Sequence, residues 1–231
     1  MSIYSREDEY IQILSKRDYT VKELSKMLFI SEPTVRRDII VMKNKNLISC
    51  QRGMVSLKTN SPDKRIPMFI RDLENREAKI KIAEKAASLI KDGNTIMLDA
   101  STTAYALLPE LSKFKNLFVI TAGAKTAIDL AAMGIKTLCI GGEIALESFS
   151  YIGADAERTL RLYNADIAFF SCRGLTEDGI VTDNSIMENS IRRIMIRNSK
   201  KSILLCDKSK IGKVYLSTLC NQNEIREIIT D

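Results

Sequence analysis

The amino-acid sequence predicts an α/β protein in two parts, an N-terminal winged helix-turn-helix domain joined to a larger α/β domain. Helix-capping signals occur three times within the first 43 residues, which is typical of a small helical module. In the longer C-terminal part, short apolar runs alternate with helical stretches, as in a mostly parallel sheet covered on both faces. Pro62 and Pro67 interrupt the pattern between the two parts. We therefore expect a domain at 1–57, a linker at 58–74 and a domain at 75–231.

Three residues mark the starts of the N-terminal helices. Ser5, Thr20 and Ser31 have side chains that can accept a hydrogen bond from a helix N-terminus. Thr20 is followed three residues later by Glu23, which completes a T-x-x-E capping box. In the third helix apolar residues recur at i, i+4 and i+7, a spacing that predicts one buried stripe, made of Val35, Ile39 and Met42.

The second and third helices are separated by a very short connection. Only Leu28 to Ile30 stand before the cap at Ser31, and two short helices joined by so tight a turn form a helix-turn-helix. Burial of the apolar stripe leaves the outer, N-terminal part of the third helix facing solvent, where a recognition helix contacts base edges and phosphates. A surface helix with a solvated basic face is the alternative, but the cap, the turn length and the basic face together favour DNA binding. The candidate DNA contacts on this helix are Ser31, Pro33, Thr34, Arg36 and Arg37.

A small hairpin is predicted directly after the third helix. Asn46 tolerates the left-handed conformation that ends a helix. The segments "LIS" and "MVSL" indicate two short strands, joined through "CQRG". A hairpin behind a helix-turn-helix is a wing, and we expect Arg52 at its tip to reach the DNA backbone or a minor groove.

Composition narrows the class of protein. The 231 residues carry a net charge of +6, and residues 1–60 hold 11 Lys or Arg against 7 Asp or Glu, so the basic excess lies in the helical module. The chain shows no secretion signal, no membrane-spanning run and no C-x-x-C pair among its five cysteines, which indicates a cytoplasmic protein with reduced thiols. Histidine is absent, which removes the commonest general base and transition-metal ligand. We therefore expect no metal, no cofactor, no catalytic residues and no membrane partner.

Six apolar runs in the C-terminal part are strand candidates. They span residues 95–99, 117–121, 136–142, 166–172, 202–207 and 227–230. Helical stretches accompany them, among others at residues 76–93, 104–114 and 124–134. Ligands of parallel α/β sheets bind beyond the carboxyl ends of the strands, so the residues that follow each run are the candidates for a binding site.

Hydroxyl groups, glycines and charged side chains follow five of these strands. Backbone N–H groups at the start of a helix, with hydroxyls beside them, suit an anion, and glycines allow the close approach of a ligand. Each turn alone is ordinary capping chemistry, whereas five at corresponding strand ends favour a small-anion pocket. The candidate residues are Asp99, Ser101, Thr102, Thr103, Thr121, Gly141, Gly142, Arg173, Asp207, Lys208 and Lys210.

The segment 182–196 adds a polar entry to another helix. Glu188 and Arg192 lie at i, i+4, a spacing typical of a surface ion pair. The alternative is that Asp183, Glu188 and Arg192 all point into the predicted pocket. Spacing alone does not choose between these two arrangements.

The order of these segments resembles the DeoR family of bacterial transcriptional regulators. "KELSKMLFISEPTVRRDI" is similar to the helix-turn-helix signature of that family, and "IMLDASTT", "GGE", "SYIGADAERTL", "ENSIRRIMI" and "DKSKIG" follow in the order of its C-terminal sensor. The resemblance implies a winged helix joined to a Rossmann-like sensor with a fold similar to ribose-5-phosphate isomerase. It also implies a double-stranded DNA operator, a phosphorylated sugar effector and assembly as a homodimer or homotetramer.

Functions of three classes are therefore compared. The first is a DNA-binding transcriptional regulator, a repressor of a sugar-metabolism operon whose operator affinity is controlled by a phosphorylated sugar. The second is a sugar-phosphate isomerase-like enzyme fused to a DNA-binding module, with Asp99, Glu188 or Lys210 as acid–base groups. The third is an interaction scaffold that uses the α/β domain only for assembly. The absence of histidine and the fused DNA-binding module argue against the enzyme.

Overall fold

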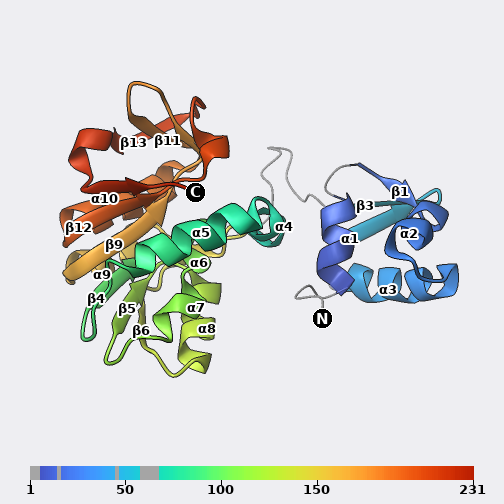
Figure 1. The fold of residues 1–231 in the computed structure, drawn as a ribbon, viewed down its shortest axis with the longest axis horizontal. Helices are drawn as coiled ribbons and strands as arrows, with labels where there is room; N and C mark the ends of the chain where they lie inside the picture. The colour runs from blue at the N-terminus through green and yellow to red at the C-terminus, as the bar shows by residue number, and fades with distance from the viewer. Residues whose placement is uncertain (1–5, 15–16, 45–46, 58–67) are drawn as a thin grey trace. The chain divides into compact units, whose positions relative to one another are not determined.

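The structure is a computed structural model, and it describes residues 6–14, 17–44, 47–57 and 68–231. The chain divides into two compact units, Met1–Glu74 and Asn75–Asp231, which are described separately (Figure 1). The helix caps predicted at Ser5 and Asn46 lie outside the described residues, as do residues 58–67 of the expected linker.

The N-terminal unit combines short helices with a three-stranded antiparallel sheet in the order β1-β3-β2. Its elements are α1 (Arg6–Leu14), β1 (Tyr19–Thr20), α2 (Val21–Leu28), α3 (Glu32–Asn44), β2 (Ile48–Gln51), β3 (Met54–Leu57) and α4 (Met68–Leu73). One apolar core joins the helices to the sheet, with Tyr10, Leu24, Met42 and Val55 fully buried in it. The predicted winged helix-turn-helix is therefore confirmed, and α4 falls within the range expected as a linker.

The helix-turn-helix has the local structure that its sequence predicts. The Thr20 hydroxyl accepts a hydrogen bond from the Glu23 backbone N–H (3.2 Å), and the Glu23 carboxylate accepts one from the Thr20 backbone N–H (2.7 Å). After α2, Phe29 adopts the left-handed conformation (φ 54°), which turns the chain towards α3. The predicted apolar stripe of α3 is buried, and it consists of Val35, Ile39 and Met42.

β2 and β3 form the predicted wing. The turn between them has only two residues, Arg52 and Gly53, with φ values of 50° and 81°. Positive φ at both central positions matches the twist of a two-residue hairpin, and glycine adopts it without strain. Gln51 therefore pairs with Met54 across the turn, and Arg52 is exposed at the tip, as expected.

Six parallel strands form the central sheet of the C-terminal unit, in the order β14-β12-β9-β4-β5-β6. The strands are β4 (Thr95–Leu98), β5 (Phe118–Thr121), β6 (Lys136–Cys139), β9 (Ala165–Ser171), β12 (Ser199–Leu205) and β14 (Glu227–Ile229). All six predicted strands are present, with ends that agree within three residues. The prediction of a mostly parallel sheet is confirmed.

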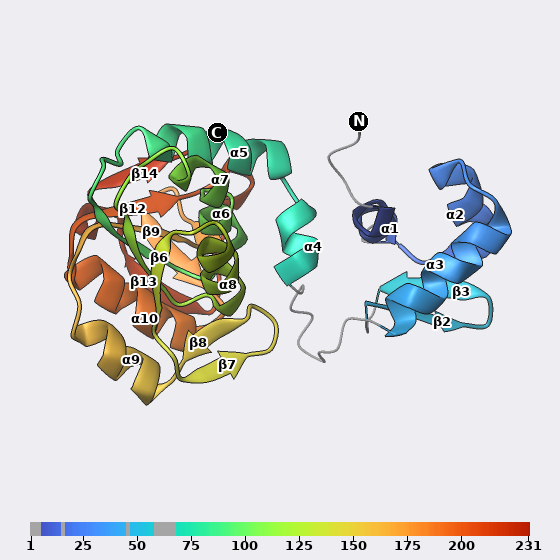
Figure 2. The same cartoon turned by 90° about the horizontal axis from the view of Figure 1, so that it is seen from below.

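Helices cover both faces of this sheet (Figure 2). Four helices pack on one face, namely α5 (Arg76–Ala87), α6 (Thr102–Tyr105), α7 (Leu108–Leu111) and α8 (Ala124–Ala132), and two on the other, α9 (Ala154–Arg161) and α10 (Ile186–Arg197). Successive strand residues alternate between the two cores, so that Ile167 and Phe169 join one core while Ala168 and Phe170 join the other. The carboxyl edge of the sheet remains for polar groups.

Two helices are shorter than the sequence suggested. The helix expected at 76–93 ends at Ala87, and the one expected at 104–114 is divided into α6 and α7. Pro109 lies in the first turn of α7, where its missing N–H is tolerated, so the chain restarts a helix there. The helix that opens after β4 is therefore only four residues long, which weakens the dipole on which an anion could draw.

Several small elements outside the central sheet were not predicted. β10 (Gly174–Leu175), β11 (Ile180–Asp183) and β13 (Ser217–Asn221) form a separate antiparallel sheet, with turns at η1 (Lys208–Lys210) and η2 (Gln222–Glu224). A hairpin of β7 (Glu143–Ala145) and β8 (Ser150–Ile152) follows β6. A bridge between Gly123 and Ser150 attaches this hairpin to the end of β5.

Candidate functional site

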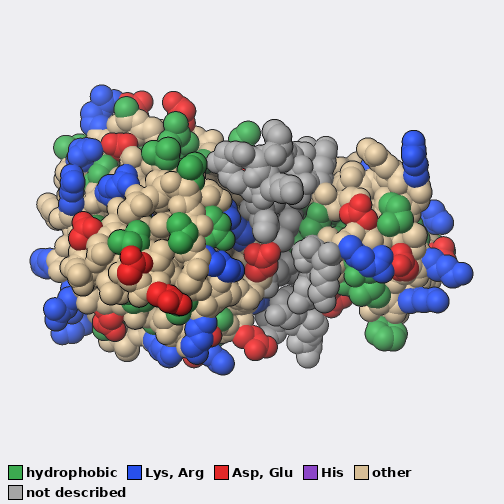
Figure 3. Space-filling view, turned by 90° about the horizontal axis from the view of Figure 1, so that it is seen from above, with side chains coloured by type: hydrophobic (Ala, Val, Ile, Leu, Met, Phe, Trp, Pro, Cys, Tyr) green, Lys and Arg blue, Asp and Glu red, His purple; other side chains and the backbone are tan. Residues whose placement is uncertain are grey.

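The outer face of α3 carries exposed basic side chains. Arg36, Arg37 and Pro33 are all exposed. The Arg36 guanidinium lies 3.7 Å from the Glu32 carboxylate, and an exposed pair of this kind contributes little to stability. Figure 3 shows further Lys and Arg side chains on the upper face of this unit, the side away from α3 in Figure 1. The arginines of α3 are therefore accessible to an anionic partner.

Ser31 begins α3 as its sequence predicts. Its hydroxyl accepts a hydrogen bond from the Thr34 backbone N–H at 3.4 Å and lies 2.9 Å from the Thr34 hydroxyl. The Ser31 carbonyl accepts a hydrogen bond from the Val35 backbone N–H at 3.0 Å. Thr34 is therefore held in the first turn, the part of a recognition helix from which phosphate contacts are made.

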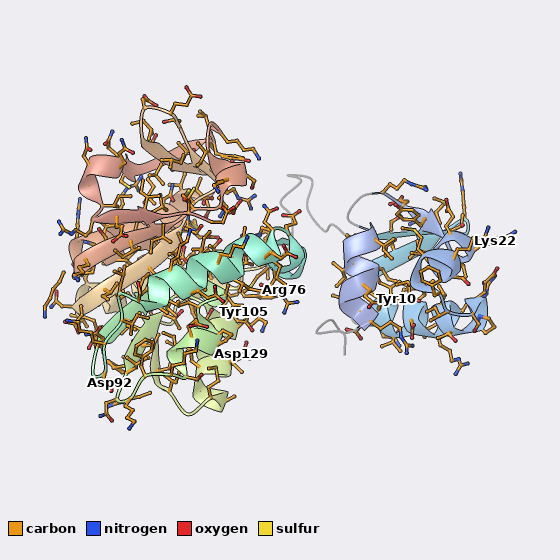
Figure 4. The ribbon with its side chains drawn as sticks, viewed as in Figure 1. Tyr10, Lys22, Arg76, Asp92, Tyr105 and Asp129 are labelled. Carbon is orange, nitrogen blue, oxygen red and sulfur yellow. The ribbon has the colours of Figure 1, made fainter. Side chains whose placement is uncertain are left out.

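Helix α1 is bonded to α3 through Asp38, a side chain that the sequence did not single out. The Tyr10 hydroxyl donates to Asp38 Oδ2 at 3.2 Å, and Arg6 Nη1 lies 3.3 Å from the same oxygen. Burial and the neighbouring Asp38 charge raise the pKa of Tyr10 well above its ordinary value, so its hydroxyl stays protonated as a donor. Tyr10 is labelled on α1 in Figure 4. The position of α3 is thus set by a polar contact as well as by the apolar core.

In the C-terminal unit, Arg192 of α10 lies among three carboxylates at the carboxyl edge of the sheet. Its Nε donates to Asp99 at 2.9 Å, its Nη1 to Asp183 at 2.9 Å and its Nη2 to Glu188 at 3.1 Å. Nη1 also donates to Asn189 at 3.2 Å. The Arg192 side chain is only 5% exposed, so the i, i+4 pair is not a surface ion pair. The arrangement in which the acidic residues and Arg192 converge is the one that forms.

Paired charges outweigh the effect of burial in this cluster. Burial opposes ionisation of Asp183, but Arg192 and Arg173, with the backbone N–H groups of Ser185 and Asn184, hold the pKa of that carboxyl below its ordinary value. Burial would also lower the pKa of Arg192, whereas its carboxylate neighbours raise it well above the ordinary value. Asp183 and Arg192 are therefore both charged at neutral pH.

Lys210 forms a second polar group at the same edge. Its Nζ donates to Ser171 Oγ at 2.9 Å and to Thr103 Oγ1 at 3.2 Å. It also lies 3.2 Å from Asp207 Oδ2, as an ion pair without hydrogen-bond alignment. Burial opposes ionisation of Asp207, yet the Lys210 charge and other donors lower its pKa. Ser171 links the Lys210 group to the Arg192 cluster, because its hydroxyl accepts from Lys210 and its backbone N–H donates to Asp99 at 3.1 Å.

Ser101 and Arg173 join these groups as predicted. The Ser101 hydroxyl donates to Asp99 Oδ1 at 2.5 Å and accepts from the Ala104 backbone N–H at 3.1 Å. Arg173 Nε lies 3.6 Å from Asp183 Oδ1, and the Arg173 side chain is 25% exposed. That ion pair is longer than a hydrogen bond, so the Arg173 guanidinium keeps donors for a ligand.

Thr121 and Lys208 have partners outside this network. The Thr121 hydroxyl donates to the Leu98 carbonyl at 3.0 Å and so ties β5 to β4. Lys208 lies 3.9 Å from Asp231, with its side chain 68% exposed. Thr102 is buried in α6, next to the residues that bond Lys210.

The two glycines after β6 serve the chain itself. Gly142 has φ 107°, and a Cβ at this position would come within 2.8 Å of the Ile152 carbonyl oxygen. The close approach that requires glycine is therefore to β8, not to a ligand. Gly141 has φ 70° and open space around it, so its requirement is one of backbone conformation.

Three further side chains reach the site without a local sequence signal. Asn75 donates to Asp207 Oδ1 at 3.2 Å, and the charge of buried Lys79 helps to lower the pKa of Asp207. Ser148 of the unpredicted hairpin donates to Glu188 Oε1 at 2.7 Å. Asn75 and Lys79 precede β4, and Ser148 lies in the turn between β7 and β8. Folding of the chain, and no local sequence pattern, brings them to the edge of the sheet.

The Arg192 guanidinium occupies the position between the three carboxylates. Within the ranges that the structure describes, no group of three or more His, Cys, Asp or Glu side chains could hold a metal ion. Among the same residues, no helix is long and apolar enough to cross a membrane.

Comparison with known proteins gives matches to both units. The family model of the DeoR-like helix-turn-helix domain matches residues 6–60, and that of the DeoR C-terminal sensor domain matches residues 74–231. The HTH-type transcriptional regulator GolR of Listeria innocua is 34% identical over 99% of this chain and 90% of its own length. The lactose phosphotransferase system repressor of Staphylococcus epidermidis is 30% identical over 100% of this chain and 93% of its own length.

Solved structures are similar to this chain at low sequence identity. The translation initiation factor eIF-2B of Pyrococcus horikoshii has a TM-score of 0.52 at 18% identity, over 96% of this chain and 86% of that chain. Ribose 5-phosphate isomerase A of Methanocaldococcus jannaschii has a TM-score of 0.45 at 21% identity, over 60% of this chain and 55% of that chain.

Proposed function

The chain belongs to the DeoR family of transcriptional regulators, and on that premise we propose that it represses a sugar-metabolism operon under the control of a phosphorylated sugar. The family consists of DNA-binding regulators rather than enzymes. The observation that carries the proposal is a winged helix with exposed arginines in the same chain as a sheet edge that gathers cations and hydroxyls. A relative named as a lactose phosphotransferase system repressor supports the sign of regulation and the connection to sugar metabolism. We place the protein in the cytoplasm, where a bacterial operator is found.

A sugar phosphate suits the chemistry of this edge. Lys210 and the partly exposed Arg173 supply positive charge for the phosphate, and charge-assisted hydrogen bonds of this kind are strong. Lys210 already donates to Ser171 and Thr103, so the phosphate would join or replace those hydroxyl contacts. Glu188 is the most exposed of the three carboxylates around Arg192 and is the acceptor best placed for a sugar hydroxyl.

In this proposal Arg192 positions carboxylates and does not contact the phosphate, although its charge alone suggested a phosphate contact. The sequence made it a candidate for direct phosphate contact. All three of its guanidinium nitrogens already donate to side chains of the chain, and breaking such a buried pair is costly. We therefore assign Arg192 to the positioning of Asp99, Asp183 and Glu188, and the phosphate contact to Lys210 and Arg173.

The effector proposal is tested by titration of a labelled operator. An operator is first selected from random duplex DNA with the full-length protein, and its binding is followed by fluorescence anisotropy. Pentose and hexose phosphates are then added, each beside the same sugar without phosphate. We expect one sugar phosphate to weaken operator binding at micromolar to millimolar concentration, while its neutral counterpart does not. Equal action by the neutral sugar, or no action by any phosphate, would contradict the proposal.

We also propose that the protein binds repeated half-sites as a homodimer or homotetramer. A single small DNA-binding module buries only about 600–1,000 Å² of protein surface on DNA, which gives limited specificity. The proposal is tested by sedimentation of the full chain and by footprinting on the selected operator. A monomer bound to one isolated half-site would refute it.

A further inference from the structure

Two large aliphatic side chains of α3 are exposed to solvent. Ile40 is 58% exposed and Val41 is 48% exposed, although the buried stripe of the same helix is complete without them. A single exposed apolar residue needs no explanation, since much of any protein surface is apolar. Ile40, however, lies among the basic residues of α3, so its exposed side chain is a candidate for a contact with DNA.

Ile40 shares one face of α3 with the candidate DNA contacts. Pro33, Arg36, Arg37 and Ile40 stand at i, i+3, i+4 and i+7, which places them on the same side of a helix. Recognition helices of homeodomains use residues at this same spacing to reach base edges in the major groove. If Arg36 and Arg37 face the groove, Ile40 faces it one turn further along the helix.

The major groove offers one apolar group to a side chain of this kind. Each base pair presents donors and acceptors there, and only thymine adds a methyl group. An aliphatic side chain cannot satisfy the polar atoms of a base edge, but it can bury the thymine methyl. We propose that Ile40 is a specificity-determining residue of this protein, which contacts the C5-methyl group of a thymine in each half-site. The inference rests on the proposed function, because it requires sequence-specific DNA binding by α3.

Val41 provides a matched comparison within the same helix. Successive residues of a helix are about 100° apart, so Val41 lies to one side of Ile40. It stands three residues after Asp38, on the side of α3 where Tyr10 and Arg6 of α1 bond Asp38. Val41 also stands four residues after Arg37, so it lies at the border between the groove-facing side of α3 and the side that bonds α1. We assign the thymine contact to Ile40 alone.

The experiment removes one methyl group at a time from the DNA. An operator is selected with the full-length protein, and each thymine of one half-site is replaced in turn by deoxyuridine, which lacks only the methyl group. Binding of the wild type, Ile40→Ala and Val41→Ala is measured at one fixed salt concentration. We expect one deoxyuridine position to weaken wild-type and Val41→Ala binding about fourfold, the factor that burial of one methyl group supplies. Ile40→Ala should bind the thymine and deoxyuridine operators equally.

The outcomes separate this inference from the function on which it rests. Sequence-specific binding with no deoxyuridine effect at any position would overturn the role of Ile40 and leave the regulator intact. An effect that persists in Ile40→Ala would assign the methyl contact to another residue and would also overturn the inference. Failure to select any specific duplex would overturn both. Because Ile40 is exposed, its replacement should leave the thermal unfolding of the unit unchanged, and this is checked by circular dichroism.

Discussion

At the scale of single residues, Arg192 shows how a buried charge fixes a site. Three carboxylates approach one guanidinium that is almost completely removed from solvent. Without the guanidinium, the cluster would keep Arg173, 3.6 Å from Asp183, as its described cation. Removal of one partner of a buried ion pair typically costs about 3–5 kcal/mol. We expect Arg192→Met to lower the free energy of unfolding of the C-terminal unit by that amount, measured by urea denaturation. Arg197→Met is the control, since Arg197 is exposed at the end of the same helix and should change stability by less than about 0.5 kcal/mol.

The same cluster makes the free energy of unfolding depend on pH. The pKa of Asp183 is held below its ordinary value of 3.8 by Arg192 and Arg173 despite burial, so the folded state binds this proton less readily than the unfolded state. The resulting stabilisation is present above about pH 4 and is lost as the pH falls through the lower pKa of the folded state. Asp183→Asn should therefore be less stable at neutral pH and should lose less stability on acidification. An unfolding midpoint that falls equally steeply in both proteins between about pH 5 and pH 3 would argue against this account.

Lys210 and Lys208 are two residues apart, and the structure assigns them different parts. Lys210 donates to Thr103 and Ser171 at the edge of the sheet, whereas Lys208 is exposed beside Asp231. Lys210→Ala should abolish the response of operator binding to the sugar phosphate, because the phosphate loses its charged donor, while operator affinity without effector stays unchanged. Lys208→Ala removes the same charge and should retain the response. A full response in Lys210→Ala, or equal losses in both variants, would show that the phosphate binds elsewhere.

At the scale of elements, the exposed arginines of α3 lead to a prediction about how operator binding depends on salt. Arg36 already lies near Glu32, whereas no ion pair is found for Arg37 among the described residues. If each arginine contacts a phosphate, its removal should lower the salt slope of operator binding by about one unit, and a base contact should cost about 1–3 kcal/mol. We expect Arg37→Ala to weaken binding more than Arg36→Ala. Arg158→Ala, which removes an exposed arginine from α9, is the control and should change neither quantity.

The elements also show why some features follow from sequence and others do not. The recurrence of apolar residues every two or every 3.6 positions, and helix caps such as Thr20, depend only on residues close in the sequence. These signals were sufficient to predict the winged helix and all six strands of the central sheet. The strands of the second sheet and the hairpin at Ser150 are short, and contacts distant in the chain determine them. The same limit applies to the site. The spacing of Glu188 and Arg192 on one helix is compatible with a surface pair, and only the folded chain brings Asp99, which follows β4, to Arg192.

At the scale of the whole molecule, the function requires that two compact units influence each other. The proposed DNA contacts belong to one unit, and the proposed effector contacts belong to the other. An effector shifts operator binding only if its affinity differs between the DNA-competent and DNA-incompetent states. The size of that difference sets the largest possible response, whatever path the coupling takes through the chain.

This coupling predicts a reciprocal change that salt cannot imitate. A dianionic sugar phosphate also raises ionic strength, and salt alone weakens DNA binding by screening and counterion release. If the effector acts through the sensor, the operator must lower effector affinity by the same factor by which the effector lowers operator affinity, about 5–150-fold for typical couplings. We expect calorimetry of the free and operator-bound protein to give that same factor, while sodium chloride of equal ionic strength gives no binding heat. Operator binding that weakens while effector affinity remains unchanged on DNA would identify the effect as screening and would remove the sensor from the mechanism.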